Sequence, residues 1–281
     1  MTGSTAGLRN REGEAEYDVT WPWRDGPLAP GLTCVFRVKN EARNLPWVLP
    51  PMFEAVQHVV LVDNGSDDGT PEVARQVVES IGATDRFTQA AYPFTVSRAG
   101  DEHLHTPPDS VHSLTYFYNW SFAQVRTAYS MKWDGDMVLT REGVELLRDL
   151  SWQLRDSGAV VAIPRHPMTV ESESVAWLDL GFRFLEPWVY PMGPEFTFVK
   201  ASSGRCASSR RPPSGSSPPR ACASSSSGWT RTSSRTGAAP TSTPCARRAR
   251  PGRSRCSGRC RRVGASRSRD CAGSRRRRAC T

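Results

Sequence analysis

The sequence predicts an α/β fold with a mostly parallel central sheet, because short apolar runs alternate with amphipathic helical stretches over the first 200 residues. Buried strands are predicted over 32–38 (LTCVFRV) and 58–62 (HVVLV). The second strand leads through a polar loop into a helix, with Thr70 as its N-cap and Gly82 as its stop. This strand–loop–helix order is half of a βαβ unit, and such units pair their strands in parallel.

The remaining elements follow from the same patterns. Pro46 suits the first turn of a helix near 45–56, whereas Pro50 and Pro51 make its continuation doubtful. Further along the chain we expect a loop over 92–108, a helix capped by Asp109 or Ser110, a strand over 130–133, a helix capped by Thr140 and stopped by Gly158, a strand over 159–163, and strand-like pieces over 186–199.

The chain divides into pieces of different composition. Residues 201–281 contain 20 Arg, no Lys and one acidic residue, Asp270, whereas the first 200 residues hold 17 basic and 27 acidic side chains. Trp229 and Val263 are the only large apolar residues of the tail, too few to offset a backbone ordering cost of about 1–2 kcal/mol per residue. We therefore predict a disordered N-terminus over 1–31, a folded domain over 32–200 and a disordered tail over 201–281.

Three interpretations of the tail stay open. The run Arg275–Arg278 could bind nucleic acid non-specifically through phosphate contacts. The segment could instead be a solvated linker, or the product of a GC-rich gene read out of frame after Lys200. Seven of the eight cysteines lie in the tail, which leaves Cys34 alone in the folded part and suits a reducing cytoplasm. No apolar run approaches the roughly 20 residues of a membrane span.

Carboxylates follow two of the predicted strands. Asp63 ends the second strand, and Asp134 and Asp136 follow the strand over 130–133. Ligands of open α/β sheets bind at the carboxyl ends of the strands, so the three aspartates are expected to converge on one divalent cation. Mg²⁺ and Mn²⁺ prefer such oxygen ligands. Taken alone, either segment could equally be an ordinary turn.

Taken together, VLVDNGSDDGT (Val60–Thr70), WDGD (Trp133–Asp136) and VFRVKNEARNL (Val35–Leu45) resemble glycosyltransferase family 2 over roughly residues 32–199. The resemblance implies a GT-A-type, Rossmann-like three-layer sandwich and a metal-dependent, inverting transfer of sugar from a nucleoside-diphosphate sugar. The cofactor would be Mn²⁺ or Mg²⁺. The acceptor could be a glycan, a lipid or a small molecule.

The resemblance also implies roles for individual residues. Asp136 is the expected direct metal ligand, and Asp134 lies near both ribose and metal. The general base is expected some tens of residues later, where Asp179, Glu186 and Glu195 are candidates that no motif separates. The residues expected to hold the nucleoside are Arg37, Lys39, Asn40, Glu41, Asp63, Asn64 and Ser66.

Other functions compete with this interpretation. A nucleotidyltransferase would need a Gly-rich phosphate loop after the first strand, where the chain has Arg37-Val38-Lys39-Asn40-Glu41. A binding remnant without catalysis is expected if the acceptor side is incomplete beyond Lys200. A nucleic-acid-binding protein would act through the basic tail.

Overall fold

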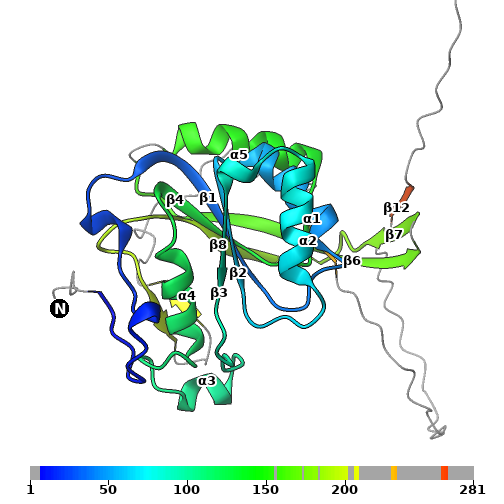
Figure 1. The fold of residues 1–281 in the computed structure, drawn as a ribbon. Helices are drawn as coiled ribbons and strands as arrows, with labels where there is room; N and C mark the ends of the chain where they lie inside the picture. Colours follow the sequence, from blue (N-terminus) through cyan, green and yellow to red (C-terminus); the bar gives the residue numbers. More distant parts are fainter. Residues whose placement is uncertain are drawn as a thin grey trace, which may run out of the picture.

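The computed structural model describes residues 7–154, 157–172, 174–182 and 184–201, together with the backbone of three short strands farther along the chain. Its main sheet has the strand order β7-β6-β8-β4-β1-β2-β3 with β12 beside β7 (Figure 1). The strands of this sheet are β1 (Ala29–Val38), β2 (His58–Asp63), β3 (Phe87–Ala91), β4 (Thr127–Trp133), β6 (Val161–Ser172), β7 (Val175–Leu178), β8 (Phe184–Pro191) and β12 (Arg261–Gly264).

The sheet has a parallel half and an antiparallel half. β4, β1, β2 and β3 are all parallel, whereas β8 runs antiparallel to β4 and to β6. Val35 lies opposite both Val60 on β2 and Lys132 on β4. This register brings the ends of β1, β2 and β4 to one edge, where the three predicted polar loops begin.

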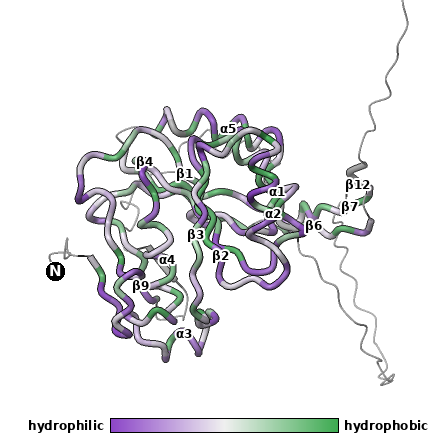
Figure 2. The backbone as a smooth tube through the Cα atoms, in the orientation of Figure 1, coloured by the Kyte–Doolittle hydropathy of each residue, from purple (hydrophilic) through white to green (hydrophobic). Residues whose placement is uncertain are grey.

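Helices cover both faces of the sheet, as Figure 1 shows. On β1, Leu32, Cys34 and Phe36 pack toward α1, α2 and α5, whereas Val35 packs toward α4 on the other face. This alternation explains why β1 carries apolar residues on both of its faces. Figure 2 shows hydrophobic stretches along the strands in the middle of the sheet. The three-layer α/β sandwich predicted from the sequence is therefore confirmed. The helices are α1 (Leu45–Ala55), α2 (Thr70–Ser80), α3 (Asp101–His105), α4 (Leu114–Phe122) and α5 (Arg141–Gln153), with short 3₁₀ turns at Ala15–Tyr17, Pro22–Arg24 and Thr84–Arg86.

Several predicted boundaries hold and others shift. Thr140 caps α5 as predicted, since its side chain accepts a hydrogen bond from the backbone N–H three residues on. α1 continues through Pro50 and Pro51 because Leu49 and Met52 are fully buried against the sheet. The helix predicted from Asp109 or Ser110 begins only at Leu114. β3 and the short α3 were not predicted.

Thr70 is not the N-cap of α2. Gly69 occupies that position with φ of +82°, and Thr70 is the first helical residue. The carboxylate of Asp68 accepts hydrogen bonds from the backbone N–H and the hydroxyl of Thr70 instead. Asp68 thus closes the start of the helix, and its own pKa is lowered because these hydrogen bonds outweigh the effect of burial.

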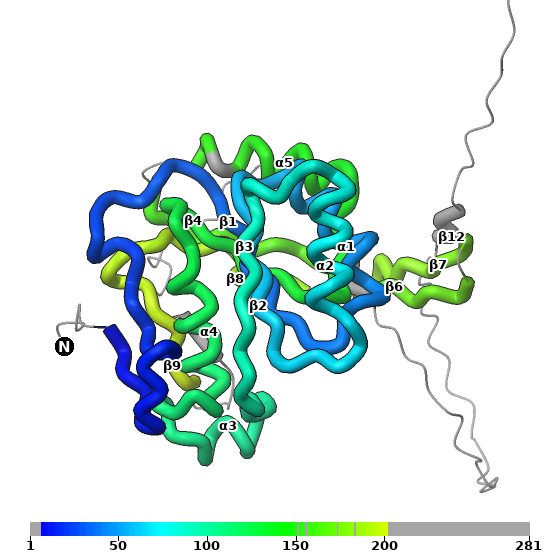
Figure 3. The backbone as a smooth tube through the Cα atoms, viewed as in Figure 1, coloured from blue at the N-terminus to red at the C-terminus, as the bar shows by residue number. Residues whose placement is uncertain are grey.

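The prediction of a disordered N-terminus was wrong for residues 7–31. Figure 3 shows this segment running beside α4. Val19 and Trp21 are buried in the same cluster as α4, and Trp21 stacks on Trp23 with ring centroids 4.7 Å apart. The carboxylate of Glu12 accepts hydrogen bonds from the hydroxyl of Ser110 and the N–H of Val111. The apolar residues of the segment are few, but they complete the second face of the sheet.

Beyond residue 201 the structure describes only the backbone of short strands. The predicted disorder of 201–281 otherwise lies outside the described residues. β5 and β11 form a branch beside β6, and β9 and β10 pair with each other. These strands are β5 (Met137–Leu139), β9 (Phe198–Lys200), β10 (Cys206–Ser208) and β11 (Trp229–Thr232).

Candidate functional site

The loops after β1 and β2 are joined to each other by hydrogen bonds. The backbone N–H of Asn40 donates to the hydroxyl of Ser66 at 2.8 Å, and the N–H of Asp67 donates to the side-chain oxygen of Asn40 at 2.9 Å. The N–H of Glu41 donates to the hydroxyl of Thr70 at 2.8 Å. The two loops therefore form one rigid polar surface at the edge of the sheet.

Asn40 has the backbone conformation that this surface requires. Its φ is +59°, which makes it the one non-glycine residue with positive φ in the described part of the chain. Asparagine tolerates this left-handed region better than most residues. The turn directs its side chain toward the second loop, whereas the neighbouring Lys39 is exposed.

The side chains of Asp63 and Asn64 form hydrogen bonds with other parts of the chain. Asp63 is 7% exposed, and its carboxylate accepts hydrogen bonds from the hydroxyl and the N–H of Ser66 at 2.5 and 3.1 Å. The side-chain amide of Asn64 donates to the carbonyls of Tyr92 and Phe94 at 2.8 and 2.7 Å. Asn64 thus ties the loop to the chain that follows β3.

The three aspartates do not converge as expected. Among the described residues there is no group of three His, Cys, Asp or Glu side chains that could hold a metal ion. β1 separates β2 from β4, and the carboxylate of Asp63 is turned toward Ser66 in its own loop. Asp63 instead borders a surface pocket of about 470 Å³ between α2 and β3, which Arg75 and Gln89 also line.

Glu41, and not Asp63, approaches the turn that contains Asp134 and Asp136. A Cβ atom at Gly135 would lie 2.7 Å from Cγ of Glu41, so the glutamate packs directly on the glycine of this turn. Burial raises the pKa of Glu41, and the carboxylates of Asp136 and Asp134 raise it further. Glu41 links the loops of β1 and β2 to the loop of β4.

A basic and aromatic region lies on the adjoining part of the sheet. The guanidinium of Arg37 lies 3.7 Å from the ring centroid of Tyr118 on α4. Lys132 on β4 lies over the ring of Trp188 on β8, and burial lowers its pKa, as does the nearby Arg37. Burial and positive neighbours both disfavour the charged form of this lysine.

The three predicted base candidates lie in different surroundings. The carboxylate of Glu186 on β8 pairs with Arg165 at 3.1 Å and acts electrostatically on Lys132, next to the turn of Asp134. Asp179 is exposed after β7, and its carboxylate accepts a hydrogen bond from the N–H of Gly181. Glu195 is exposed between β8 and β9. The structure therefore brings Glu186 to the candidate site.

Several residues of the site could not be selected from the sequence. Tyr118, Arg165 and Trp188 lie on elements whose pairing with β1 and β4 depends on long-range register. In the sequence, Tyr118 is one of several aromatic residues on a predicted helix, and Arg165 and Trp188 lie in or beside strand-like segments. None of these patterns indicates a role in a site. Asp68 shapes the turn as well as the start of α2, since its carboxylate also accepts a hydrogen bond from the N–H of Ala42.

Comparison with known proteins gives structural similarity only. No family model and no curated protein sequence matches the chain. A mannosyltransferase from Pyrobaculum calidifontis in complex with GDP-Man and Mn²⁺ is 20% identical with a TM-score of 0.35, over 51% of this chain and 39% of that one. TarS from S. aureus is 15% identical with a TM-score of 0.36, over 62% and 52%.

A third solved structure is glucosyl-3-phosphoglycerate synthase from Mycobacterium tuberculosis in complex with Mn²⁺, UDP-glucose and phosphoglyceric acid. It is 14% identical with a TM-score of 0.30, over 48% of this chain and 43% of that one. The chain thus spans about two fifths to one half of the length of these proteins. In the part of the chain that the structure describes, no helix is both long and apolar enough to span a membrane.

Proposed function

We propose that the chain is a glycosyltransferase that moves a sugar from a nucleoside-diphosphate sugar to an acceptor hydroxyl. The observation that carries this proposal is the joining of three polar loops at one edge of the sheet. Asn40 and Ser66 connect the loops of β1 and β2, and Glu41 rests on Gly135 between Asp134 and Asp136. Ligands of open α/β sheets bind at this edge.

The donor set fits a divalent cation that shares its ligands with a substrate. Asp134 and Asp136 offer carboxylate oxygens on either side of Gly135, against which the side chain of Glu41 packs. Mg²⁺ and Mn²⁺ need only one or two protein carboxylates when substrate phosphates and water complete the shell. When bound, such an ion stabilises the charge of a departing diphosphate.

The joined loops are proposed to hold the nucleoside. The hydrogen-bonded chain from Asn40 through Ser66 to Asp63 fixes the backbone of both loops before any ligand arrives. The pocket bordered by Asp63, Arg75 and Gln89 adjoins this surface. Preorganisation of this kind lowers the entropic cost of binding.

Glu186 is proposed as the general base. The acceptor hydroxyl would attack the anomeric carbon from the face opposite the diphosphate, which inverts its configuration, and the Glu186 carboxylate would accept the hydroxyl proton. Arg165 holds this carboxylate at 3.1 Å, and the side chain is 38% exposed, so an acceptor can reach it.

Calorimetric titration with UDP, GDP, ADP and dTDP in the presence of Mn²⁺ tests the donor site. We expect one of these nucleotides to bind, with a loss of at least about tenfold in affinity on adding EDTA or on Asp136→Asn. Asp149→Asn, an exposed aspartate on α5, is the matched control. Equal binding by Asp136→Asn and the native chain would refute the proposed metal site.

Transfer is measured separately with the sugar nucleotide of whichever base binds. Glu186→Gln should abolish hydrolysis or transfer while nucleotide binding persists. Nucleotide binding by the native chain without any turnover would indicate a catalytically inactive remnant instead.

A further inference from the structure

Two cations on different strands share one buried indole ring. The register that pairs Met131 with Val189 brings Lys132 beside Trp188, and Arg165 on β6 reaches the same ring from the far side of β8. Lys132 Nζ lies 4.6 Å and Arg165 Cζ 4.9 Å from the centroid of the Trp188 ring. We call Lys132, Arg165 and Trp188 the cation cluster.

The cation cluster has more donors than acceptors. Arg165 is only 8% exposed, and one of its terminal nitrogens pairs with Glu186 at 3.1 Å. Its Nε and the Nε1 of the 2% exposed Trp188 are buried without hydrogen-bond partners among the described residues. Lys132 is half-buried beside the same ring.

Unpaired donors in a buried site are costly unless something else accepts from them. A buried polar group without a partner destabilises a fold, because it has lost its hydrogen bonds to water and gained none in return. Arg37, Arg165 and the carboxylates of Glu186 and Asp134 all act electrostatically on Lys132. Counting Lys132 itself, three cations face two carboxylates, so a neutral acceptor would leave positive charge uncompensated. A phosphate or carboxylate group would satisfy both the donors and the charge, and a guanidinium matches the geometry of either.

We propose that the cation cluster binds a phosphate or carboxylate group of the acceptor. This rests on the proposed function, because it identifies the acceptor as an anionic molecule whose hydroxyl is presented to Glu186. The cluster lies on the β4–β8–β6 side of the sheet, whereas the joined loops proposed to hold the nucleoside lie at β1 and β2. An anion at Arg165 would also compete with Glu186 for the guanidinium and release the carboxylate as a base.

The probe is inorganic phosphate, titrated into the full chain in EDTA-containing buffer and followed by calorimetry or by NMR. We expect saturable binding to the native chain that is at least tenfold weaker in Arg165→Gln and in Lys132→Met. Glu186→Gln should bind phosphate more tightly, because Arg165 loses its competing carboxylate. Destabilisation of the fold would lower the phosphate affinity of all three variants alike. A rise in affinity for Glu186→Gln beside a fall for the other two variants therefore distinguishes a binding effect from misfolding.

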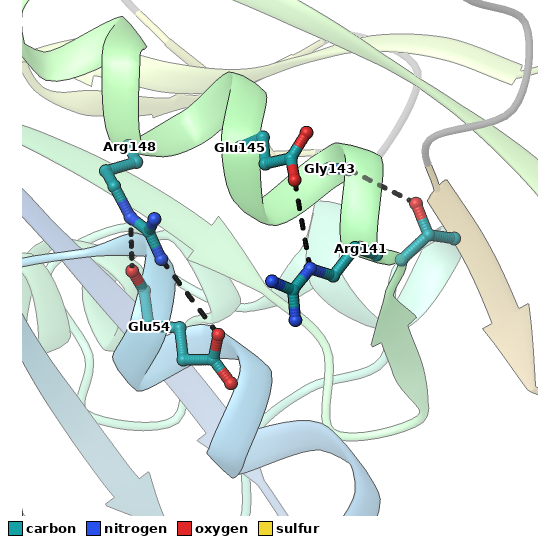
Figure 4. A network of polar contacts seen from close by, with 6 residues as sticks. Glu54, Arg141, Gly143, Glu145 and Arg148 are labelled. Atoms are coloured by element: carbon teal, nitrogen blue, oxygen red, sulfur yellow. Dashed lines mark hydrogen bonds and ion pairs between the residues drawn. The ribbon is translucent and has the colours of Figure 1, made fainter. Parts of the chain in front are cut away.

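Arg148→Gln is the matched control. This exposed arginine lies on α5, outside the cation cluster, and pairs with Glu54 of α1 at 4.0 Å (Figure 4). Absence of phosphate binding by the native chain, or equal loss in the control, would overturn the proposal. A second titration at saturating nucleoside diphosphate and Mn²⁺ identifies the source of the anion. Retained phosphate binding supports an acceptor site, and displacement would overturn that assignment. The EDTA titration is informative even if no nucleotide binds, so it can succeed or fail independently of the proposed function.

Discussion

Ser66 is the single side chain on which the joined loops depend most directly. Its hydroxyl donates to the carboxylate of Asp63 at 2.5 Å and accepts from the N–H of Asn40 at 2.8 Å. Ser66→Ala removes both bonds and leaves the largely buried carboxylate with one hydrogen bond fewer. A hydrogen bond to a charged group contributes about 1.5–3 kcal/mol to the free energy of unfolding, and a bond between neutral groups about 1 kcal/mol. Both contributions are smaller where the groups are exposed to solvent.

We therefore expect Ser66→Ala to lower the free energy of unfolding by roughly 2 kcal/mol. For a domain of this size that corresponds to a fall in Tm of about 4–8 °C. Urea unfolding and differential scanning calorimetry measure the two quantities. Ser80→Ala is the matched control, because its exposed hydroxyl bonds only to the carbonyl of Val77 within α2. A change in Ser66→Ala no larger than that of the control would show that the loops are not joined in this way.

Three further predictions concern other parts of the molecule. The pKa of Glu41 is raised in the folded state, so its contribution to stability is present below the unfolded pKa and is lost as pH rises through the folded value. In metal-free urea titrations, Glu41→Gln should thus be more stable than the native chain at neutral pH and equal to it in acid. Thr140→Ala should destabilise by about 1 kcal/mol through loss of the α5 cap, measured by urea unfolding. Trp21→Ala should destabilise by about 3–5 kcal/mol if the N-terminal segment is part of the core, and an unchanged Tm would contradict this.

Local patterns were sufficient for the parallel half of the sheet. The apolar runs of β1 and β2 and the helix stop at Gly82 depend on neighbours within a few residues. β3 could not be predicted from the sequence, because FTQAA lacks a long apolar run and its residues are at most half-buried at the edge of the sheet. The packing of the N-terminal segment could not be predicted either, because the segment is mostly polar and is attached to the core through two buried residues, Val19 and Trp21.

The candidate site was predictable in its location but not in its membership. Position at the carboxyl ends of strands follows from the α/β class, and it brought the loops of β1, β2 and β4 together. Which side chains meet depends on loop conformation. The positive φ of Asn40 and the turn at Ser66 direct Asp63 away from Asp134, and they leave Glu41 against Gly135.

The antiparallel half of the sheet supplies the cation cluster, which we propose binds the acceptor. Because β8 runs antiparallel to β4, Trp188 lies beside Lys132. Because β6 pairs with the other edge of β8, Arg165 reaches the same ring. A parallel strand in the place of β8 would enter this edge from the opposite end and offer different side chains. The acidic loops therefore depend on the parallel strands, whereas the cation cluster depends on a reversal of strand direction. Under this proposal, the diphosphate of the donor binds the acidic loops through a divalent cation, and the anionic group of the acceptor binds the cation cluster directly.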